Sequence, residues 1–335
     1  MLRGIAQAQD KARELGINGI SLEIVIADDN NDIATAQEIA PILAADPMIL
    51  AVIGSNASGP SLSSAPIYQQ TRIVMISPTS FSGDLSGFGD YIFRTIPNIS
   101  SQVKTLASYA VNQSKKQRFL ICSDTGAMDN QIFQQEFTQA VISLNVEVLP
   151  TACDIAQPSF DAAATLKQAI SQGADALLIA PHVDYPERGI QLAQAAQGKL
   201  ALFASPTLYN STLLSAAGNN LKNLVIAAPW YADSNSTTSF LAQAQQRWGD
   251  TSLTWRTATS FDATMAIAAA LGQIPPEQPW GRSQLQQQLR SPGFKAQGAG
   301  ETVQFLPTGD RAGKAILLRV QKRAREQGYE FKALT

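Results

Sequence analysis

Two short apolar segments, each followed by small hydroxyl residues, place the strongest constraint on the fold of this chain. Ala51–Ile53 is followed by the sequence GSNASGP, and Ile73–Ile76 is followed by SPTS. Continuous apolar runs of this length are typical of buried parallel strands, and open α/β sheets bind ligands just beyond the carboxyl ends of their strands. The two segments therefore predict neighbouring strands that deliver hydroxyl groups and backbone amides to one crevice.

The helix expected after the first segment offers a place for a negatively charged group. Ser58 can cap this helix, and Pro60 is tolerated in its first turn. A helix start has N–H groups without intrahelical partners and a partial positive charge, which suit a carboxylate. The alternative is an ordinary capped helix with no role in binding.

Composition excludes several classes of function. The 335 residues are 45% hydrophobic and 16% charged, which is enough for two globular domains. The formal net charge of −2 and the scattered basic residues exclude a nucleic-acid partner. The sequence shows neither an apolar run that could span a bilayer nor the pattern of a signal peptide. Cys122 and Cys153 lie in neighbouring strand-like segments, but sequence cannot establish disulfide geometry, so two free thiols are the favoured interpretation.

The chain begins with the pattern of a packed helix. Its apolar stripe, which Gly16 ends, is formed by Leu2, Ile5, Ala8, Ala12 and Leu15. A helix that packs on a parallel sheet normally follows a strand. The pattern therefore predicts a strand, and with it any export segment, upstream of residue 1.

Strand and helix patterns alternate along the rest of the chain. The first series has expected strands at 22–27, 50–53 and 73–76 and helices at 33–45 and 61–70. The second series has helices at 101–112, 131–143, 160–172, 186–196 and 208–216 and strands at 118–122, 146–150, 176–180, 200–204 and 224–228. Helices at 239–248, 260–272 and 282–289 and a hairpin-like segment at 303–320 follow.

This order predicts an α/β fold of two doubly wound parallel-sheet lobes joined by a multi-segment hinge. Residues 1–96 and 231–290 are expected in lobe I, and residues 97–230 and 291–335 in lobe II, with a tail shared between the lobes as the alternative. A hinge of this kind suits closure around a ligand.

Several motifs, present in this order, resemble one known family. They are GIAQAQD at 4–10, GING at 16–19, DDNND at 28–32, GSNAS at 54–58, SPTS at 77–80, YIFRT at 91–95 and WRTATSFDA at 255–263. Together they resemble the leucine/isoleucine/valine-binding protein family over nearly the whole chain. The resemblance implies a type I periplasmic binding protein: a monomeric, periplasmic or extracytoplasmic protein that delivers a small carboxylate or amino acid to an ABC permease in the membrane. It implies no enzymatic activity, cofactor or metal.

The family's ligand contacts match this chain only in part. Ser58 stands where the family places a hydroxyl on the ligand carboxylate, and Thr79 where a loop backbone contacts carboxylate and amine. Phe81, Met128 and Phe261 replace a threonine, an aromatic residue and a tyrosine that are common in the family. The complete set of expected ligand-binding residues is Asn56, Ser58, Ser77, Thr79, Ser80, Phe81, Met128, Asp184, Thr207, Tyr209 and Phe261.

The acidic partner of a ligand ammonium is missing from its expected place, which Pro206 or Thr207 occupies. An unpaired ammonium in a dry site would cost several kcal/mol. Either Asp184 supplies the charge from a neighbouring loop, or the ligand lacks an ammonium, as a 2-oxo acid or another small carboxylate does. Asp184 could instead cap the helix that begins at Pro186.

Two other functions are alternatives to ligand delivery. The chain could be the ligand-sensing domain of a larger signalling protein, which the sequence upstream would decide. An enzyme is disfavoured because no nucleophile, base and orienting group converge. The acidic run that ends at Asp32 lacks the spacing of a calcium loop, so Asp32 is expected to cap the following helix.

Overall fold

The computed structural model describes residues 1–335 except 18, 20, 184, 233–238, 250–252, 324–327 and 335, and leaves the side chains of 211–213 undescribed. The chain forms two compact units. Unit 1 contains Met1–Asn98 and Ser234–Gly313, and unit 2 contains Ile99–Asp233 and Lys314–Thr335. The segment 291–313, expected in the second lobe, belongs to unit 1, because Phe294, Ala296 and Val303 lie in the core of that unit.

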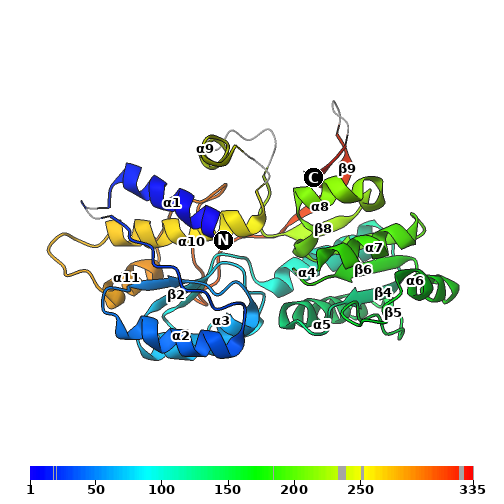
Figure 1. The fold of residues 1–335 in the computed structure, drawn as a ribbon, viewed down its shortest axis with the longest axis horizontal. Helices are drawn as coiled ribbons and strands as arrows, with labels where there is room; N and C mark the ends of the chain where they lie inside the picture. The colour runs from blue at the N-terminus through cyan, green and yellow to red at the C-terminus, as the bar shows by residue number, and fades with distance from the viewer. Residues whose placement is uncertain are drawn as a thin grey trace. The chain divides into compact units, whose positions relative to one another are not determined.

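Unit 1 is a small parallel sheet with helices on both faces (Figure 1). Its strands β1 (Ala51–Ile53), β2 (Val74–Ser77) and β3 (Ile92–Arg94) pair in that order, with Val52 opposite Met75 and Ile76 opposite Phe93. The helices of unit 1 are α1 (Leu2–Leu15), α2 (Ile33–Ala45), α3 (Ser58–Gln70), α9 (Ser239–Trp248), α10 (Trp255–Gly272) and α11 (Arg282–Arg290), with a short 3-10 helix at Gly83–Leu85.

The alternation of side chains along β2 divides the core of unit 1 in two. Val74 and Ile76 pack in a cluster with residues of α1, α10 and α11, whereas Met75 packs in a cluster with residues of α2 and α3. Successive residues of a strand point to opposite faces, so each face of this sheet buries its own apolar layer. This is why the run at 73–76 is apolar throughout rather than alternating.

Helices α1 and α10 lie side by side in unit 1 (Figure 1) and touch closely. A Cβ on Gly4 would stand 2.0 Å from the Thr257 carbonyl oxygen, so only glycine permits this approach. Ile5, Ala8 and Ala12 of the predicted stripe are buried, whereas Leu2 and Leu15 at its ends are exposed. The helix ends at Gly16, as expected, with φ 72°.

The expected strand at 22–27 is wrong. No described strand includes these residues, and the side chains of Val25 and Ile26 are 67% and 68% exposed. An extended segment becomes a strand only when a neighbour accepts its backbone hydrogen bonds, and β1 pairs among the described strands with β2 alone. The cap on α2 is confirmed, because the Thr35 amide donates to Asp32 Oδ1 at 2.8 Å.

Unit 2 contains a seven-stranded sheet in the order β10-β9-β8-β7-β6-β4-β5. Its parallel strands are β4 (Arg118–Ser123), β5 (Glu147–Val148), β6 (Ala176–Ala180), β7 (Ala201–Ala204) and β8 (Val225–Ala228). Its helices are α4 (Ile99–Ser108), continued by a π-helical turn at Tyr109–Gln113, then α5 (Met128–Ile142), α6 (Ala162–Ser171), α7 (Pro186–Ala196) and α8 (Ser211–Ala217), with 3-10 turns at Pro206–Leu208 and Gly218–Leu221.

The hairpin-like segment expected at 303–320 is correct only for its first part, where Phe305 and Arg311 form an antiparallel bridge around a turn. Strand β9 (Ile316–Lys322) pairs antiparallel with β8 and with β10 (Tyr329–Ala333), and so belongs to the sheet of unit 2. The preceding residues instead form isolated bridges in unit 1, between Ala296 and Val303 and between Phe305 and Arg311. The tail is therefore divided between the two units near residue 313.

Candidate functional site

The loops that follow β1 and β2 meet in a buried cluster of hydroxyl groups. Ser58 Oγ lies 2.8 Å from Ser80 Oγ and accepts hydrogen bonds from the amides of Phe81 and Ser82 at 2.9 and 3.2 Å. Because β1 and β2 are parallel neighbours, their carboxyl ends share one edge of the sheet. Ser58 therefore ties the start of α3 to the loop after β2.

Other expected site residues join the same network. Thr79 Oγ1 donates to the Asn56 carbonyl at 2.7 Å, and Ser77 Oγ accepts from the Ser80 amide at 3.3 Å. Asn56 is half-buried, and its Nδ2 donates to Asn31 Oδ1 at 3.1 Å. The structure thus brings together Asn56, Ser58, Ser77, Thr79 and Ser80, which we call the hydroxyl cluster. Their hydrogen bonds hold the two loops in place.

The start of α3 has no side-chain cap. The expectation that Ser58 caps this helix is wrong: Ser58 is its first residue, and Ala57 stands at the N-cap position without an oxygen to offer. Gly59 and Pro60 follow in the first turn, as the sequence predicted. Pro60 has no N–H and the Ser61 amide donates to the Ala57 carbonyl at 3.2 Å, so this helix start can offer an anion the Gly59 amide and the positive end of the helix dipole.

An aromatic stack lies beside the hydroxyl cluster. The rings of Phe81 and Trp255 stack at 5.6 Å between centroids and 20° between planes, and both residues are buried. Arg256 lies over the Trp255 ring at 4.4 Å from its centroid. Phe261, expected beside the ligand, packs edge-to-face on Phe240 of α9 at 4.8 Å and is 3% exposed. Trp255 was not selected from the sequence, although it opens the WRTATSFDA motif.

A buried ion pair supports the loop after β2. Arg94 Nε donates to Asp310 Oδ1 at 2.7 Å, and the same guanidinium donates to the carbonyls of Ser80 and Ser82. Asp310 Oδ2 also accepts from Ser86 Oγ at 2.6 Å. The two charged residues are 216 positions apart in the sequence, so no local pattern could have paired them.

The neighbouring residue makes a second buried ion pair in unit 1. Arg311 donates to Asp262 of α10, and the Ala299 amide donates to the other carboxylate oxygen at 2.6 Å. Both charged side chains are almost fully buried. Two consecutive residues, Asp310 and Arg311, therefore anchor the tail of unit 1 through charges of opposite sign.

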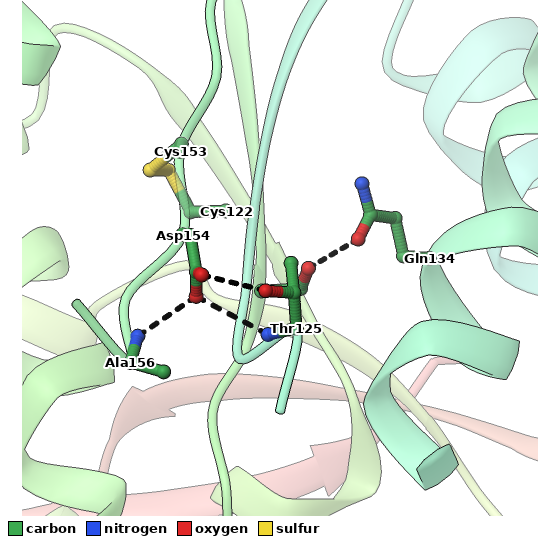
Figure 2. Close-up of a disulfide and its surroundings, with 7 residues drawn as sticks. Cys122, Thr125, Gln134, Cys153, Asp154 and Ala156 are labelled. Carbon is green, nitrogen blue, oxygen red and sulfur yellow. Dashed lines mark hydrogen bonds between the residues drawn. A yellow bond between two sulfur atoms is a disulfide. The ribbon is translucent and has the colours of Figure 1, made fainter. Parts of the chain in front are cut away.

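In unit 2, a disulfide joins the end of β4 to the segment that follows β5 (Figure 2). Cys122 and Cys153 are bonded with their Cα atoms 4.6 Å apart, so the expectation of two free thiols is wrong. The pairing follows from the backbone: Ser123 and Asp154 form a parallel bridge, which places the preceding residues side by side. Sequence spacing did not reveal this bridge because it lies beyond the short strand β5.

Asp154 organises this region further (Figure 2). Its carboxylate accepts hydrogen bonds from Thr125 Oγ1 at 2.6 Å and from the Ala156 amide at 2.9 Å. Burial raises the pKa of Asp154, but these hydrogen bonds and one from Gln157 outweigh it and lower the pKa to about 2. The loop after β4 is thus fixed by a covalent bond and by an ionised carboxylate.

The described site residues expected in unit 2 follow the carboxyl ends of its parallel strands. Met128 is the first residue of α5 and is 40% exposed, and Thr207 lies in the 3-10 turn after β7. Tyr209 is buried, its hydroxyl accepts from the Ala232 amide at 3.3 Å, and its ring packs edge-to-face on Phe331. Burial raises the pKa of Tyr209. Asp184 lies outside the described residues.

Two polar groups at this edge were missed by sequence reasoning. Ser205 Oγ, directly after β7, and Asn130 Nδ2, in the first turn of α5, are buried without a hydrogen-bond partner among the described residues. An unpaired buried polar group is costly, so each of these groups needs a hydrogen-bond partner outside the described residues. Ser205 directly precedes Pro206 and Thr207, which occupy the place of the acidic partner of a ligand ammonium.

Comparison with known proteins supplies the family. Residues 1–325 match the family model described as "Periplasmic binding protein". The chain belongs to the periplasmic binding protein family. This confirms the predicted α/β fold class and the resemblance on which the ligand-binding residues were assigned.

Curated relatives and solved structures agree with this assignment. Leucine-specific-binding protein from Salmonella typhimurium is 27% identical over 232 residues, which cover 68% of this chain and 62% of the relative. An ABC transporter substrate-binding protein from Desulfitobacterium hafniense, solved in complex with Leu, has a TM-score of 0.77 and 24% identity, covering 99% of this chain and 95% of its own. A solute-binding protein from Rhodopseudomonas palustris, in complex with 3,4-dihydroxybenzoic acid, has a TM-score of 0.79 and 16% identity over 99% and 92%.

The match therefore spans less than two thirds of the curated relative's length. In the part of the chain that the structure describes, no helix is long and apolar enough to cross a membrane.

Proposed function

We propose that this protein captures a small carboxylate-bearing molecule outside the cytoplasm and delivers it to the permease of an ABC-type importer. The observation that carries the proposal is the uncapped start of α3 within the hydroxyl cluster. Ala57 at the N-cap has no side-chain oxygen, so an external anion can take the place of the capping group.

The energies favour a carboxylate at this position. The positive end of a helix contributes about 0.3–1 kcal/mol to binding an anion. Each charge-assisted hydrogen bond adds roughly 1.5–3 kcal/mol. The bonds of Ser58 and Thr79 fix the backbone of both loops beforehand, so little ordering of the site is left for the ligand to drive.

The apolar part of the ligand is assigned to the side of Phe81. Its ring is held by the stack on Trp255 and offers a fixed apolar surface next to the hydroxyl cluster. The relatives' ligands support this combination. Leucine and 3,4-dihydroxybenzoic acid both carry a carboxylate on an apolar body, and only leucine carries an ammonium.

Two classes of ligand match this proposal, and they differ in whether the molecule carries an ammonium group. Among the described residues, the turn Pro206–Leu208 contains no acidic side chain. An aliphatic amino acid would need another anion, for which Asp184 is the candidate from the sequence. A 2-oxo acid or another small carboxylate would need none.

A thermal-shift screen separates these classes. Leucine, its 2-oxo analogue 4-methyl-2-oxopentanoate, and 3-methylbutylamine differ only at the groups in question. A ligand at 100 times its Kd stabilises the native state by about 2.7 kcal/mol, which shifts the unfolding midpoint measurably. We expect at least one of the two carboxylates to raise the midpoint and the amine to leave it unchanged. Stabilisation by the amine alone would overturn the proposal.

A substitution at the helix start gives a sharper test. Ala57→Asp places a carboxylate at the N-cap, where it can accept from the Gly59 amide and meet the helix dipole, so the free protein should gain up to about 1 kcal/mol while ligand affinity falls at least tenfold. The matched variant Ala57→Gly adds no oxygen and should retain binding. Equal affinities for the Asp and Gly variants, measured by calorimetry, would place the ligand carboxylate elsewhere.

A further inference from the structure

Unit 2 contains a pocket at the edge of its sheet opposite the candidate site residues. The pocket has a volume of about 780 Å³ and includes Ala201 and Val225, the first residues of β7 and β8. Ser205 and Thr207, in contrast, follow the carboxyl end of β7. The pocket is therefore separate from the ligand site proposed above, and its volume is within the range of small-molecule sites.

The charged residues that line this pocket are all positive. They are Lys116, Lys199, Lys222 and Arg319. No carboxylate lines the pocket, and none of these four residues forms an ion pair with an Asp or Glu in the part of the chain that the structure describes. The chain as a whole is slightly acidic, so a hollow with only positive charge is not an average property of its surface.

Arg319 lies on β9 between two flanking strands, and its side chain contacts Tyr109. Its guanidinium donates to the Tyr109 hydroxyl and lies 5.9 Å from the centroid of that ring. Val225 of β8 and Lys332 of β10 stand directly opposite Arg319 on the flanking strands. Like charges at directly opposed sheet positions destabilise each other, and a bound anion relieves that repulsion. An arginine has five N–H donors, so the bond to Tyr109 leaves most of them for a ligand.

The remaining lining combines amide side chains with an apolar floor. Hydrogen-bonding groups are supplied by Gln197, Asn219, Asn220 and Asn223, and apolar surface by Leu200, Leu202 and Phe203. Amides bind the oxygens of an anion without adding charge. The apolar floor accommodates an uncharged part of the same molecule.

We propose that this pocket binds a soluble phosphate compound that carries more than one negative charge. Arginine and lysine together are the usual donors to phosphate oxygens, arginine through its planar fork and lysine as a point charge. Four positive charges in one hollow exceed what a single carboxylate would neutralise. Pyrophosphate is the simplest probe of this chemistry.

Calorimetric titration of the full chain with sodium pyrophosphate tests the proposal, with sodium chloride adjusted to constant ionic strength. We expect saturable binding that weakens as salt is raised. Lys222→Gln and Arg319→Gln should each raise Kd roughly tenfold, the loss of one charge-assisted hydrogen bond. Lys167→Gln, which removes an exposed lysine of α6 outside the pocket, should leave Kd unchanged.

Three results of these experiments would contradict the proposal. Absence of saturable heat, or equal weakening by Lys167→Gln and Lys222→Gln, would show that no site for phosphate exists here. Because Lys222 is exposed, its replacement tests binding even if Arg319→Gln disturbs folding. Co-sedimentation with phosphatidylglycerol vesicles but no binding of pyrophosphate would assign the positive charges to lipid headgroups instead. Failure of this titration leaves the carboxylate site of unit 1 untouched.

Discussion

Removal of the disulfide between Cys122 and Cys153 should destabilise unit 2, and the length of the loop that the disulfide closes sets the size of the effect. The two residues are 31 positions apart, and the chain-entropy relation for a loop of that length gives about 3.7 kcal/mol at 25 °C. For a domain of 150–250 residues, each kcal/mol shifts the unfolding midpoint by about 2–4 °C. Reduction should therefore lower the midpoint of unit 2 by roughly 7–15 °C.

Scanning calorimetry with and without a phosphine reductant measures this shift. The double variant Cys122→Ser/Cys153→Ser should unfold near the midpoint of the reduced protein and should not respond to the reductant. Thiol titration in denaturant should find no free thiol before reduction and two afterwards.

Two results would refute the reasoning. Two titratable thiols in the unreduced, denatured protein would show that the bond is absent. An unchanged midpoint after complete reduction would show that the hydrogen bonds of Asp154 and the bridge at Ser123 hold this region without the covalent bond.

Three further perturbations have defined outcomes. Gly4→Ala should force α1 away from the Thr257 carbonyl and cost about 1–3 kcal/mol in urea unfolding, and an unchanged midpoint would contradict the close contact. Asp310→Asn should leave Arg94 buried without its counter-charge and cost about 3–5 kcal/mol, whereas a loss below 1 kcal/mol would mean that water replaces the carboxylate. Asp154 has a folded pKa of about 2 against about 3.9 in unfolded chains, so it stabilises the fold above pH 4 and loses this effect as pH falls toward 2. Asp154→Asn should reduce the drop in unfolding midpoint between pH 5 and pH 2, and an identical drop in both proteins would exclude this carboxylate as a cause.

Local patterns predicted most elements because their causes are local. The helices Ile33–Ala45 and Pro186–Ala196 and the strand Ala176–Ala180 lie where capping residues and apolar runs indicated. The segment 22–27 has the apolar residues of a strand but lacks a described partner strand, and strand formation depends on that partner. β10 was missed because its sequence, Tyr-Glu-Phe-Lys-Ala, is short and half polar, and its pairing with β9 decides its structure.

The sequence predicted where the candidate site lies, but it did not predict the hydrogen bonds that its residues make. The hydroxyl residues after β1 and β2 do meet, because parallel neighbours end at the same edge. Ser58 bonds to the loop after β2 and does not cap α3. This choice depends on the backbone geometry, which composition does not encode. Phe261 shows the same limit, since its helix α10 turns that ring toward Phe240 in the core.

The two consecutive ion pairs at Asp310 and Arg311 have a consequence for synthesis on the ribosome. The first strands of unit 1 emerge more than 200 residues before the tail that neutralises Arg94. At about 5–20 residues per second, they wait roughly 10–40 s for the charges and apolar side chains that cover them. During that interval the face of β2 that α10 and α11 later bury has no partner, so unit 1 completes its core only after its tail has been synthesised.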